Sequence, residues 1–194
     1  MFIGKIVSAS SHVDYVCQVF ARGEAEVMPE PADHGFGQFV AIEAVDGNSL
    51  VGLIHNTTLL NPDFGNLGPR LSPHEDLAVF APDYLSEQAT LVAILVVGML
   101  DARLQARQGV PTIAAHPDAR VRALARDEVM AFHRCTGGLQ IAYLPLLNGL
   151  QSALAPSLLE HTFAQLSTLF PADSDRLNVL RANVAWRSRI LPTG

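Results

Sequence analysis

The first half of the chain contains short runs that are rich in β-branched and aromatic residues and are bounded by Gly, Pro, Asn or Asp. In one run every second residue from Tyr15 to Ala21 is apolar, which is the spacing of an extended strand with one buried face. Residues 46–49, with the sequence DGNS, form a tight turn between two such runs. The pattern predicts six strands: Phe2–Ala9, Tyr15–Ala21, Gln38–Val45, Leu50–His55, Asp76–Phe80 and Thr90–Leu100.

No long helical pattern interrupts these six runs, so they favour a small antiparallel β-barrel over a parallel sheet with crossover helices. Two loops rich in Pro and Gly lie between them, at residues 28–37 and 61–73. Long loops on a small barrel often carry contacts with other molecules.

The periodicity changes after Asp101. Residues 102–116 are expected to be a connector, and residues 118–135 fit either one helix or a short extended link followed by a helix capped by Asp127. Residues 139–147 are apolar enough to be buried, and leucines and phenylalanines at helical spacing predict a helix over residues 151–169. A last helix is expected to begin at Asp173 or Ser174. The chain is thus predicted to be an α+β protein, with a barrel in residues 1–101 and a connector and helical region in residues 102–194.

Length and composition add limits to this picture. The chain has 194 residues, of which 49% are hydrophobic, so it can bury a substantial core. Its longest uncharged apolar run, Leu91–Leu100, is half as long as the roughly 20 residues of a membrane-spanning helix. With no secretory signal at its start, the chain is expected to be cytoplasmic and not bound to a membrane. Two distant cysteines exclude a disulfide scaffold and a cysteine-based zinc ribbon.

Charge is distributed unevenly along the chain. Between Gly23 and Asp101 there are twelve acidic residues and one basic residue, whereas ten arginines and six acidic residues follow from Ala102 onward. The acidic first half disfavours direct binding of nucleic acid, because such binding depends on cations. A basic face near the C-terminus would comprise Arg176, Arg181, Arg187 and Arg189. The alternative is that these arginines are solvated or pair with acidic residues of a neighbouring subunit.

Most catalytic motifs are absent from the sequence. Lys5 is the only lysine, which excludes a phosphate-binding loop ending in Gly-Lys, and neither the dinucleotide-binding glycine pattern nor the hydrolase pattern Gly-x-Ser-x-Gly occurs. No cofactor or metal is therefore expected from motifs. The seven histidines lack metal-site spacing. One alternative remains, a small enzyme or a ligand-binding or metal-binding site made from loops, using His34, His74, Glu75 and Asp76.

Five segments share an order with a known module. They are Ile3–Ser8 (IGKIVS), Gly37–Ile42 (GQFVAI), Leu50–Ile54 (LVGLI), Val97–Leu100 (VGML) and Pro117–Val121 (PDARV). Taken together they resemble the HAS barrel, the β-barrel shared by HerA-type DNA-translocating ATPases and the catalytic subunits of ATP synthase. Asp118 stands where the HerA-type link has a glycine.

The resemblance covers residues 2–135, after which the family would continue into an ATPase, whereas residues 136–194 here predict helices. It implies a role in ring assembly or in docking a partner nuclease. We therefore expect a non-enzymatic barrel that associates with itself, in a ring, or with a protein partner, as an accessory to a HerA-type ATPase or nuclease in DNA processing. The expected contact residues are Phe36, Phe39, Phe64, Leu67 and Arg70. The alternative is a monomeric barrel with these side chains inside.

Overall fold

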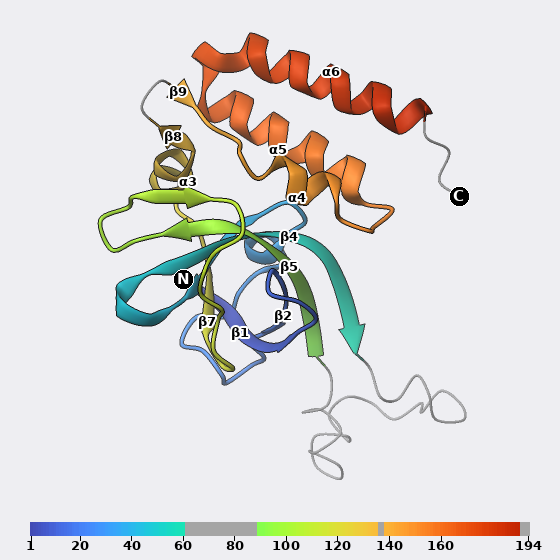
Figure 1. The fold of residues 1–194 in the computed structure, drawn as a ribbon. Coiled ribbons are helices and arrows are strands. Elements are labelled where there is room, and N and C mark those ends of the chain that lie inside the picture. Colours follow the sequence, from blue (N-terminus) through green and yellow to red (C-terminus); the bar gives the residue numbers. More distant parts are fainter. Residues whose placement is uncertain (61–88, 136–137, 191–194) are drawn as a thin grey trace, which may run out of the picture.

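The computed structural model describes residues 1–60, 89–135 and 138–190, with a β-sheet at one end and a layer of helices at the other (Figure 1). The protein is α+β, as predicted. The larger sheet comprises β1 (Phe2–Ala9), β2 (Asp14–Val19), β3 (Phe39–Glu43), β4 (Ser49–Leu60), β5 (Ala89–Leu100), β6 (Ala106–Gln108) and β7 (Arg120–Ala123). The helices are α3 (Arg126–His133), α4 (Leu144–Asn148), α5 (Ala155–Leu169) and α6 (Ser174–Ile190). Short elements complete the chain: η1 (Pro31–His34), η2 (Val45–Gly47), η4 (Pro171–Asp173), β8 (Arg134–Cys135) and β9 (Gly138–Leu139).

The strands of the large sheet pair in a ring. Following hydrogen-bonded neighbours, β2 leads to β1, β7, β3, β4 and β5, and β5 pairs again with β2. All these pairings are antiparallel, and β6 adds to β5 outside the ring. Such an arrangement leaves few unpaired strand edges, which are the parts of a sheet most prone to unwanted pairing.

Alternation along each strand divides the apolar residues into two clusters. On β4, Leu50 and Ile54 belong to a cluster whose fully buried members all come from the ring strands, which places it inside the ring. Val51 and Leu53 point the other way and join a second cluster that includes residues of α3, α4, α5 and α6. The core is therefore double, with one part enclosed by strands and the other lying between the sheet and the helices.

Five predicted strands are confirmed, and one of them, Phe2–Ala9, has the predicted bounds. The predicted strand Asp76–Phe80 lies outside the described residues. Strand β7 takes part in the ring instead, and it comes from the segment for which two alternatives were open, so the extended link followed by a helix is correct. Strand β6 lies inside the expected connector, so the sheet extends past residue 101.

Helix α3 begins differently from the prediction. Asp127 does not cap it: Ala125 is the N-cap residue, and the carboxylate of Glu128 accepts a hydrogen bond of 2.9 Å from the Ala125 N–H. The same carboxylate receives two hydrogen bonds of 2.6 Å from Arg122 of β7. A single acidic side chain thus joins the ring to the helical layer, which explains why the helix starts where it does.

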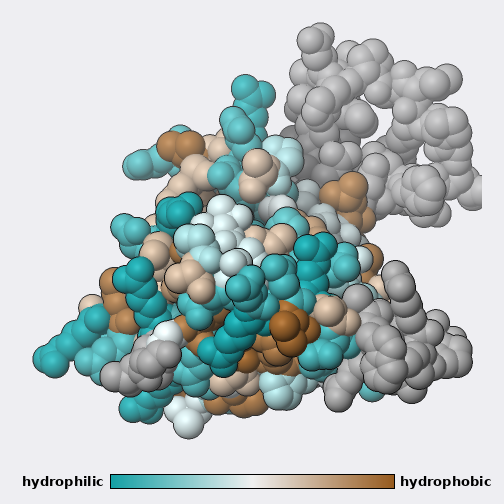
Figure 2. All heavy atoms as spheres, turned by 90° about the horizontal axis from the view of Figure 1, so that it is seen from above, coloured by the Kyte–Doolittle hydropathy of each residue, from teal (hydrophilic) through white to brown (hydrophobic). Residues whose placement is uncertain are grey.

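The two predicted C-terminal helices are confirmed. Proline at residue 156 lies in the first turn of α5, where no backbone N–H is needed, and α6 begins at Ser174 after a short 3-10 turn. Helix α6 lies along α5 on the side away from the sheet (Figure 1). In the described part of the chain, no helix has the length and apolarity to cross a bilayer. Seen from this helical side, hydrophobic residues show between hydrophilic ones on the surface (Figure 2).

Candidate functional site

The histidine and acidic residues expected to form a loop site are not brought together among the described residues. His34 ends η1 and is half-buried, whereas His74, Glu75 and Asp76 lie outside the described part of the chain. Within residues 1–60, 89–135 and 138–190, no three His, Cys, Asp or Glu side chains are close enough to hold a metal ion together.

Two buried groups that could carry chemistry are held in inert forms. Burial raises the pKa of the Cys17 thiol to about 12, so the thiol stays protonated at neutral pH. Burial also lowers the pKa of His133 to about 4, against a weaker opposing effect of its bond to Val129. Neutral His133 then donates from Nδ1 to the Val129 carbonyl and accepts at Nε2 from the Tyr143 hydroxyl, each at 2.7 Å. Both groups are parts of the core.

A third buried group is His55, on β4. Its Nε2 lies 3.3 Å from Oδ1 of Asp14, and its Nδ1 has no hydrogen-bond partner among the described residues. A catalytic triad would need a nucleophile on the other ring nitrogen, and no Ser, Thr or Cys of the described chain bonds to it.

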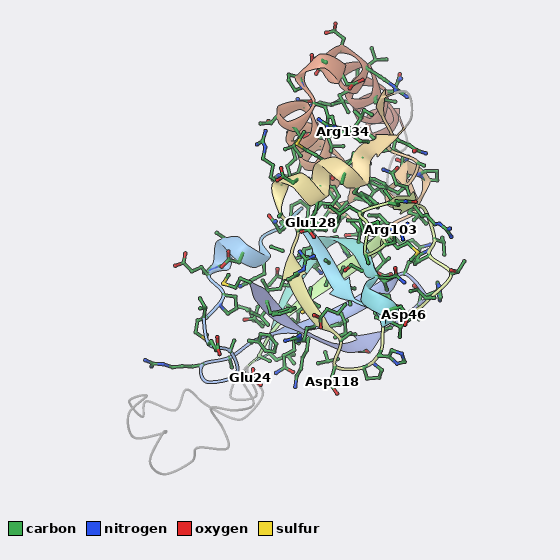
Figure 3. All side chains as sticks on the ribbon, turned by 90° about the vertical axis from the view of Figure 1, so that its left-hand side faces the viewer. Glu24, Asp46, Arg103, Asp118, Glu128 and Arg134 are labelled. Carbon is green, nitrogen blue, oxygen red and sulfur yellow. The ribbon has the colours of Figure 1, made fainter. Side chains whose placement is uncertain are left out.

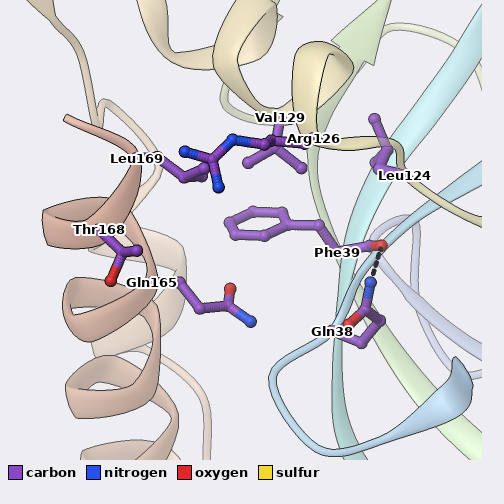
Figure 4. Close-up of a pocket in the computed structure, with 8 residues that line it drawn as sticks. All are labelled: Gln38, Phe39, Leu124, Arg126, Val129, Gln165, Thr168 and Leu169. Carbon is purple, nitrogen blue, oxygen red and sulfur yellow. Dashed lines mark hydrogen bonds between the residues drawn. The ribbon is translucent and has the colours of Figure 1, made fainter. Parts of the chain in front are cut away.

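A cleft between α3, α5 and the start of β3 is the site that the fold does assemble. It has a volume of about 340 Å³ and is lined by Gln38, Phe39, Leu124, Arg126, Val129, Gln165, Thr168 and Leu169. We call it the α3–α5 cleft. Figure 4 shows the ring of Phe39 projecting into it, with Arg126 and Val129 on one side and the α5 residues facing them.

The floor of the α3–α5 cleft is apolar and well fixed. Phe39, Leu124 and Val129 are buried, with 2%, 6% and 7% of their surfaces exposed, and all belong to the core between the sheet and the helices. Backbone bonds hold this floor in place: the Leu124 N–H donates to the Phe39 carbonyl at 2.9 Å. Apolar residues held in place by the core favour an apolar guest, because the cavity that they line is already formed before binding.

The rim of the cleft is polar but carries only one charge. The amide of Gln38 donates to the backbone carbonyl of Phe39 at 3.4 Å, and the Gln165 amide lies 3.2 Å from the ring of His161. The hydroxyl of Thr168 donates to the carbonyl of Ala164. Arg126 is exposed, and no carboxylate among the described residues forms an ion pair with it. The cleft therefore suits an apolar side chain accompanied by a negative charge.

A second cavity shares one lining residue, Leu169, with the α3–α5 cleft. Its volume is about 370 Å³, and its lining includes Leu139, Phe170 and Pro171 with the charged residues Arg134 and Asp173. The end of α5 thus lies beside two cavities with largely apolar linings. Arg126 lines one of them and Arg134 lines the other.

Of the expected contact residues that the structure describes, Phe36 and Phe39, only Phe39 lines the α3–α5 cleft. Phe36 is half-buried and packs edge-on against His161, with ring centroids 6.3 Å apart. Phe39 lines the cleft, and its side chain is largely buried because β3 directs it between the sheet and the helices. Phe64, Leu67 and Arg70 lie outside the described residues.

The expected basic face is also described only in part. Arg176 is tied to the chain itself, since its guanidinium donates to the Leu139 carbonyl at 3.2 Å. Arg181 is exposed on α6, and the side chains of Arg187 and Arg189 lie outside the described part. The arginine at the cleft rim, Arg126, was not among the predicted residues.

Sequence reasoning missed the cleft because its lining comes from three separate segments, residues 38–39, 124–129 and 165–169. Leu124, Val129 and Leu169 appear in the sequence as ordinary core positions of a strand end and two helices. One signal was available: Arg126 starts a helix and is followed at once by two acids, an unusual place for a cation since the helix dipole favours negative charge there.

The family model described as Domain of unknown function (DUF8166) matches residues 1–193. A search of curated proteins gives no match.

Proposed function

We propose that this chain, which belongs to the DUF8166 family, is a non-enzymatic docking module: a small β-barrel with a helical layer that binds another polypeptide at the α3–α5 cleft. The polypeptide is a second copy or a protein partner. The observation that carries the proposal is the composition of the cleft, an apolar floor with Arg126 as its one charged residue. A catalytic site would require several titratable groups converging there.

The arrangement of the two cores supports a scaffold over an enzyme. The space inside the ring is occupied by side chains such as Ile3, Val40 and Val121, each fully buried. A barrel filled in this way offers its outer surface, and not its interior, to other molecules. The α3–α5 cleft lies on that outer side, where the helical layer meets the sheet.

The size of the cleft fits a side-chain anchor. At about 340 Å³ it has room for one or two aliphatic side chains, each contributing about 1.5–3 kcal/mol when fully buried. By resemblance to the HAS barrel, the process in which such docking would serve is DNA processing beside a HerA-type ATPase or nuclease. Direct contact with nucleic acid is not part of the proposal.

Light scattering tests the proposal. We expect the purified chain to exceed its monomer mass of 20.9 kDa between about 1 and 100 µM, or to form a complex of defined mass with a HerA-type ATPase or nuclease from the same genome. Thr168→Glu, which places an acid at the exposed rim, should weaken the association. Val179→Glu is the matched control, since Val179 is 62% exposed on α6 and does not line the cleft. A strict monomer that binds neither protein would refute the proposal.

A further inference from the structure

A loop elsewhere on the chain has the features that the α3–α5 cleft would select. Residues 23–30, here called the acidic loop, have the sequence GEAEVMPE, with three acids and no base. Val27 and Met28 are adjacent in this loop and are 61% and 44% exposed. Two exposed apolar side chains beside Glu26 form an apolar anchor with a negative charge.

Hydrogen bonds at both ends hold the acidic loop in shape. On one side the Ala21 N–H donates to the carboxylate of Glu24 at 2.7 Å, and the Glu24 N–H donates back to the Ala21 carbonyl at 3.1 Å. On the other side the Glu30 N–H donates to the carboxylate of Asp33 at 2.7 Å, and the Asp33 N–H returns a bond to the Glu30 carbonyl at 2.9 Å. These bonds fix the two ends of the loop, which reduces the entropy that the loop loses when it binds.

Buried Pro29 adds to this constraint, because it anchors the chain directly after the two exposed apolar residues. Val27 and Met28 are consequently held away from the core. Exposed apolar pairs on a rigid support are typical of binding surfaces, whereas single exposed apolar residues are common on any protein.

The acidic loop and the cleft lie on different parts of the molecule. Figure 3 shows Glu24 near the lower end and Arg134, at the end of α3, in the upper part beside the helical layer. In the structure the loop lines a separate hollow, together with Met1, Phe2 and Arg120. A copy does not fill its own cleft with its loop, so both surfaces remain for neighbouring copies.

We infer that the acidic loop of one copy docks into the α3–α5 cleft of the next, with Val27 and Met28 against the apolar floor and Glu26 paired with Arg126. This inference rests on the proposed function and names the occupant as a second copy of the chain. Charge complementarity favours that occupant, since the only charged residues of the loop are acidic, and the cleft is lined by an arginine that forms no ion pair with any described residue. Because the two surfaces differ, the contact is head-to-tail and generates a closed ring or an open chain of copies.

Complementation between two variants tests this geometry. The loop variant carries Val27→Glu with Met28→Glu, and the cleft variant carries Arg126→Glu with Thr168→Glu; all four side chains are exposed, so the fold should be retained. Each variant alone should associate at least about tenfold more weakly than the parent chain, and appear as a monomer of 20.9 kDa. An equimolar mixture should form a species of two chains and no larger one, since only one intact loop and one intact cleft can meet.

A charge exchange provides a second test. Glu26→Arg and Arg126→Glu should each weaken association of the chain, and the two changes combined in one chain should restore it. Val179→Glu and Val110→Glu are matched controls on exposed residues, 62% and 59% exposed, that belong to neither surface, and they should leave the mass unchanged.

Failure of the inference is distinguishable from failure of the proposed function. If the loop variant still forms homo-oligomers but the cleft variant does not, another segment occupies the cleft, and the inference is wrong while docking at the cleft stands. If both variants still form homo-oligomers, the contact lies elsewhere and the proposed docking site is wrong as well. The exposed end of β4 is then the next surface to examine, because Leu59 is 74% exposed there and β3 pairs only with Ser49–Leu53. A parent chain that stays monomeric but binds a HerA-type ATPase or nuclease also overturns the inference alone.

Discussion

The Tyr143 hydroxyl donates a 2.7 Å hydrogen bond to Nε2 of His133, and both side chains are completely buried between the sheet and the helices. Aromatic rings surround the pair: Phe39 and Phe132 pack edge-on against the imidazole, with centroids 5.2 and 5.1 Å away. The bond joins the end of α3 to the start of α4. It therefore stabilises the helical layer that carries the α3–α5 cleft, in surroundings where water cannot replace either partner.

Removing the hydroxyl should destabilise the protein. In Tyr143→Phe the imidazole of His133 keeps a buried acceptor without a donor, so the free energy of unfolding should fall by about 1–3 kcal/mol. Urea unfolding followed by circular dichroism measures the change. In the double variant with His133→Leu the two effects should not add, because the first substitution already breaks the bond. A loss below about 0.5 kcal/mol in Tyr143→Phe would contradict the prediction.

Stability should also fall in mild acid because of His133. Its pKa is about 4 in the folded protein and 6.5 when exposed, so the unfolded chain binds a proton there that the folded chain does not. The free energy of unfolding is thus unaffected above pH 6.5 and decreases as the pH falls from 6.5 to 4, by about 3 kcal/mol over that window. Urea unfolding at pH 7, 5.5 and 4.5 checks this. The decrease in the free energy of unfolding should be smaller in His133→Gln. If that variant shows the same decrease as the parent chain, the pH dependence comes from groups other than His133.

The carboxylate of Glu128 should contribute more to the free energy of unfolding than a comparable carboxylate on the surface. Its side chain is 18% exposed and receives two bonds from Arg122, which hold its pKa below the ordinary value. Glu128→Gln should cost about 1–3 kcal/mol at pH 7, and this difference should vanish in acid, where the carboxylate itself becomes protonated.

The pair of Arg120 and Glu43 is the matched control for that substitution. It has similar geometry, with a distance of 3.0 Å, but the two side chains are 55% and 43% exposed. Solvent screens such a pair, so Glu43→Gln should change the free energy of unfolding by less than about 1 kcal/mol. If Glu128→Gln and Glu43→Gln lower the free energy of unfolding equally, the ion pair between β7 and α3 stabilises the protein no more than a surface pair does.

Gly37 should not tolerate a side chain. Its φ is +77°, and a Cβ atom there would overlap Cδ2 of His161 on α5. Gly37→Ala should therefore lower the free energy of unfolding by about 1 kcal/mol for the backbone and by a further amount for the overlap. Gly23→Ala isolates the backbone effect, since Gly23 has a φ of +95° and nothing within 4 Å of a Cβ. Adding His161→Ala should recover part of the loss in Gly37→Ala and none in Gly23→Ala.

Much of the fold was predictable from local pattern. Short apolar runs rich in β-branched residues and bounded by turn residues placed β1 to β5, because a strand with one face in each core is apolar on both faces. The helical spacing of leucines likewise placed α5, and the proline at residue 156 agreed with its first turn. These features depend on neighbours a few positions apart in the chain.

The rest required the tertiary structure. Strand β7 has only four residues, and what makes it a strand is its pairing with β1 and β3, which are distant in sequence. The Glu128 carboxylate, held by Arg122 of the adjacent strand, accepts the Ala125 N–H and so sets where α3 starts. The capping preference of Asp127 did not decide that start.

The sequence by itself determined that the chain folds into strands followed by helices, that its charge is divided between two halves, and that it lacks the common catalytic motifs. Only the tertiary structure decided that the strands pair in a ring with a filled interior, and that Gln38, Arg126 and Leu169 lie around one cleft. The physical reason is that periodicity reports which face of a segment is buried but not what lies against it. A cleft between segments that are distant in the chain is set by packing alone.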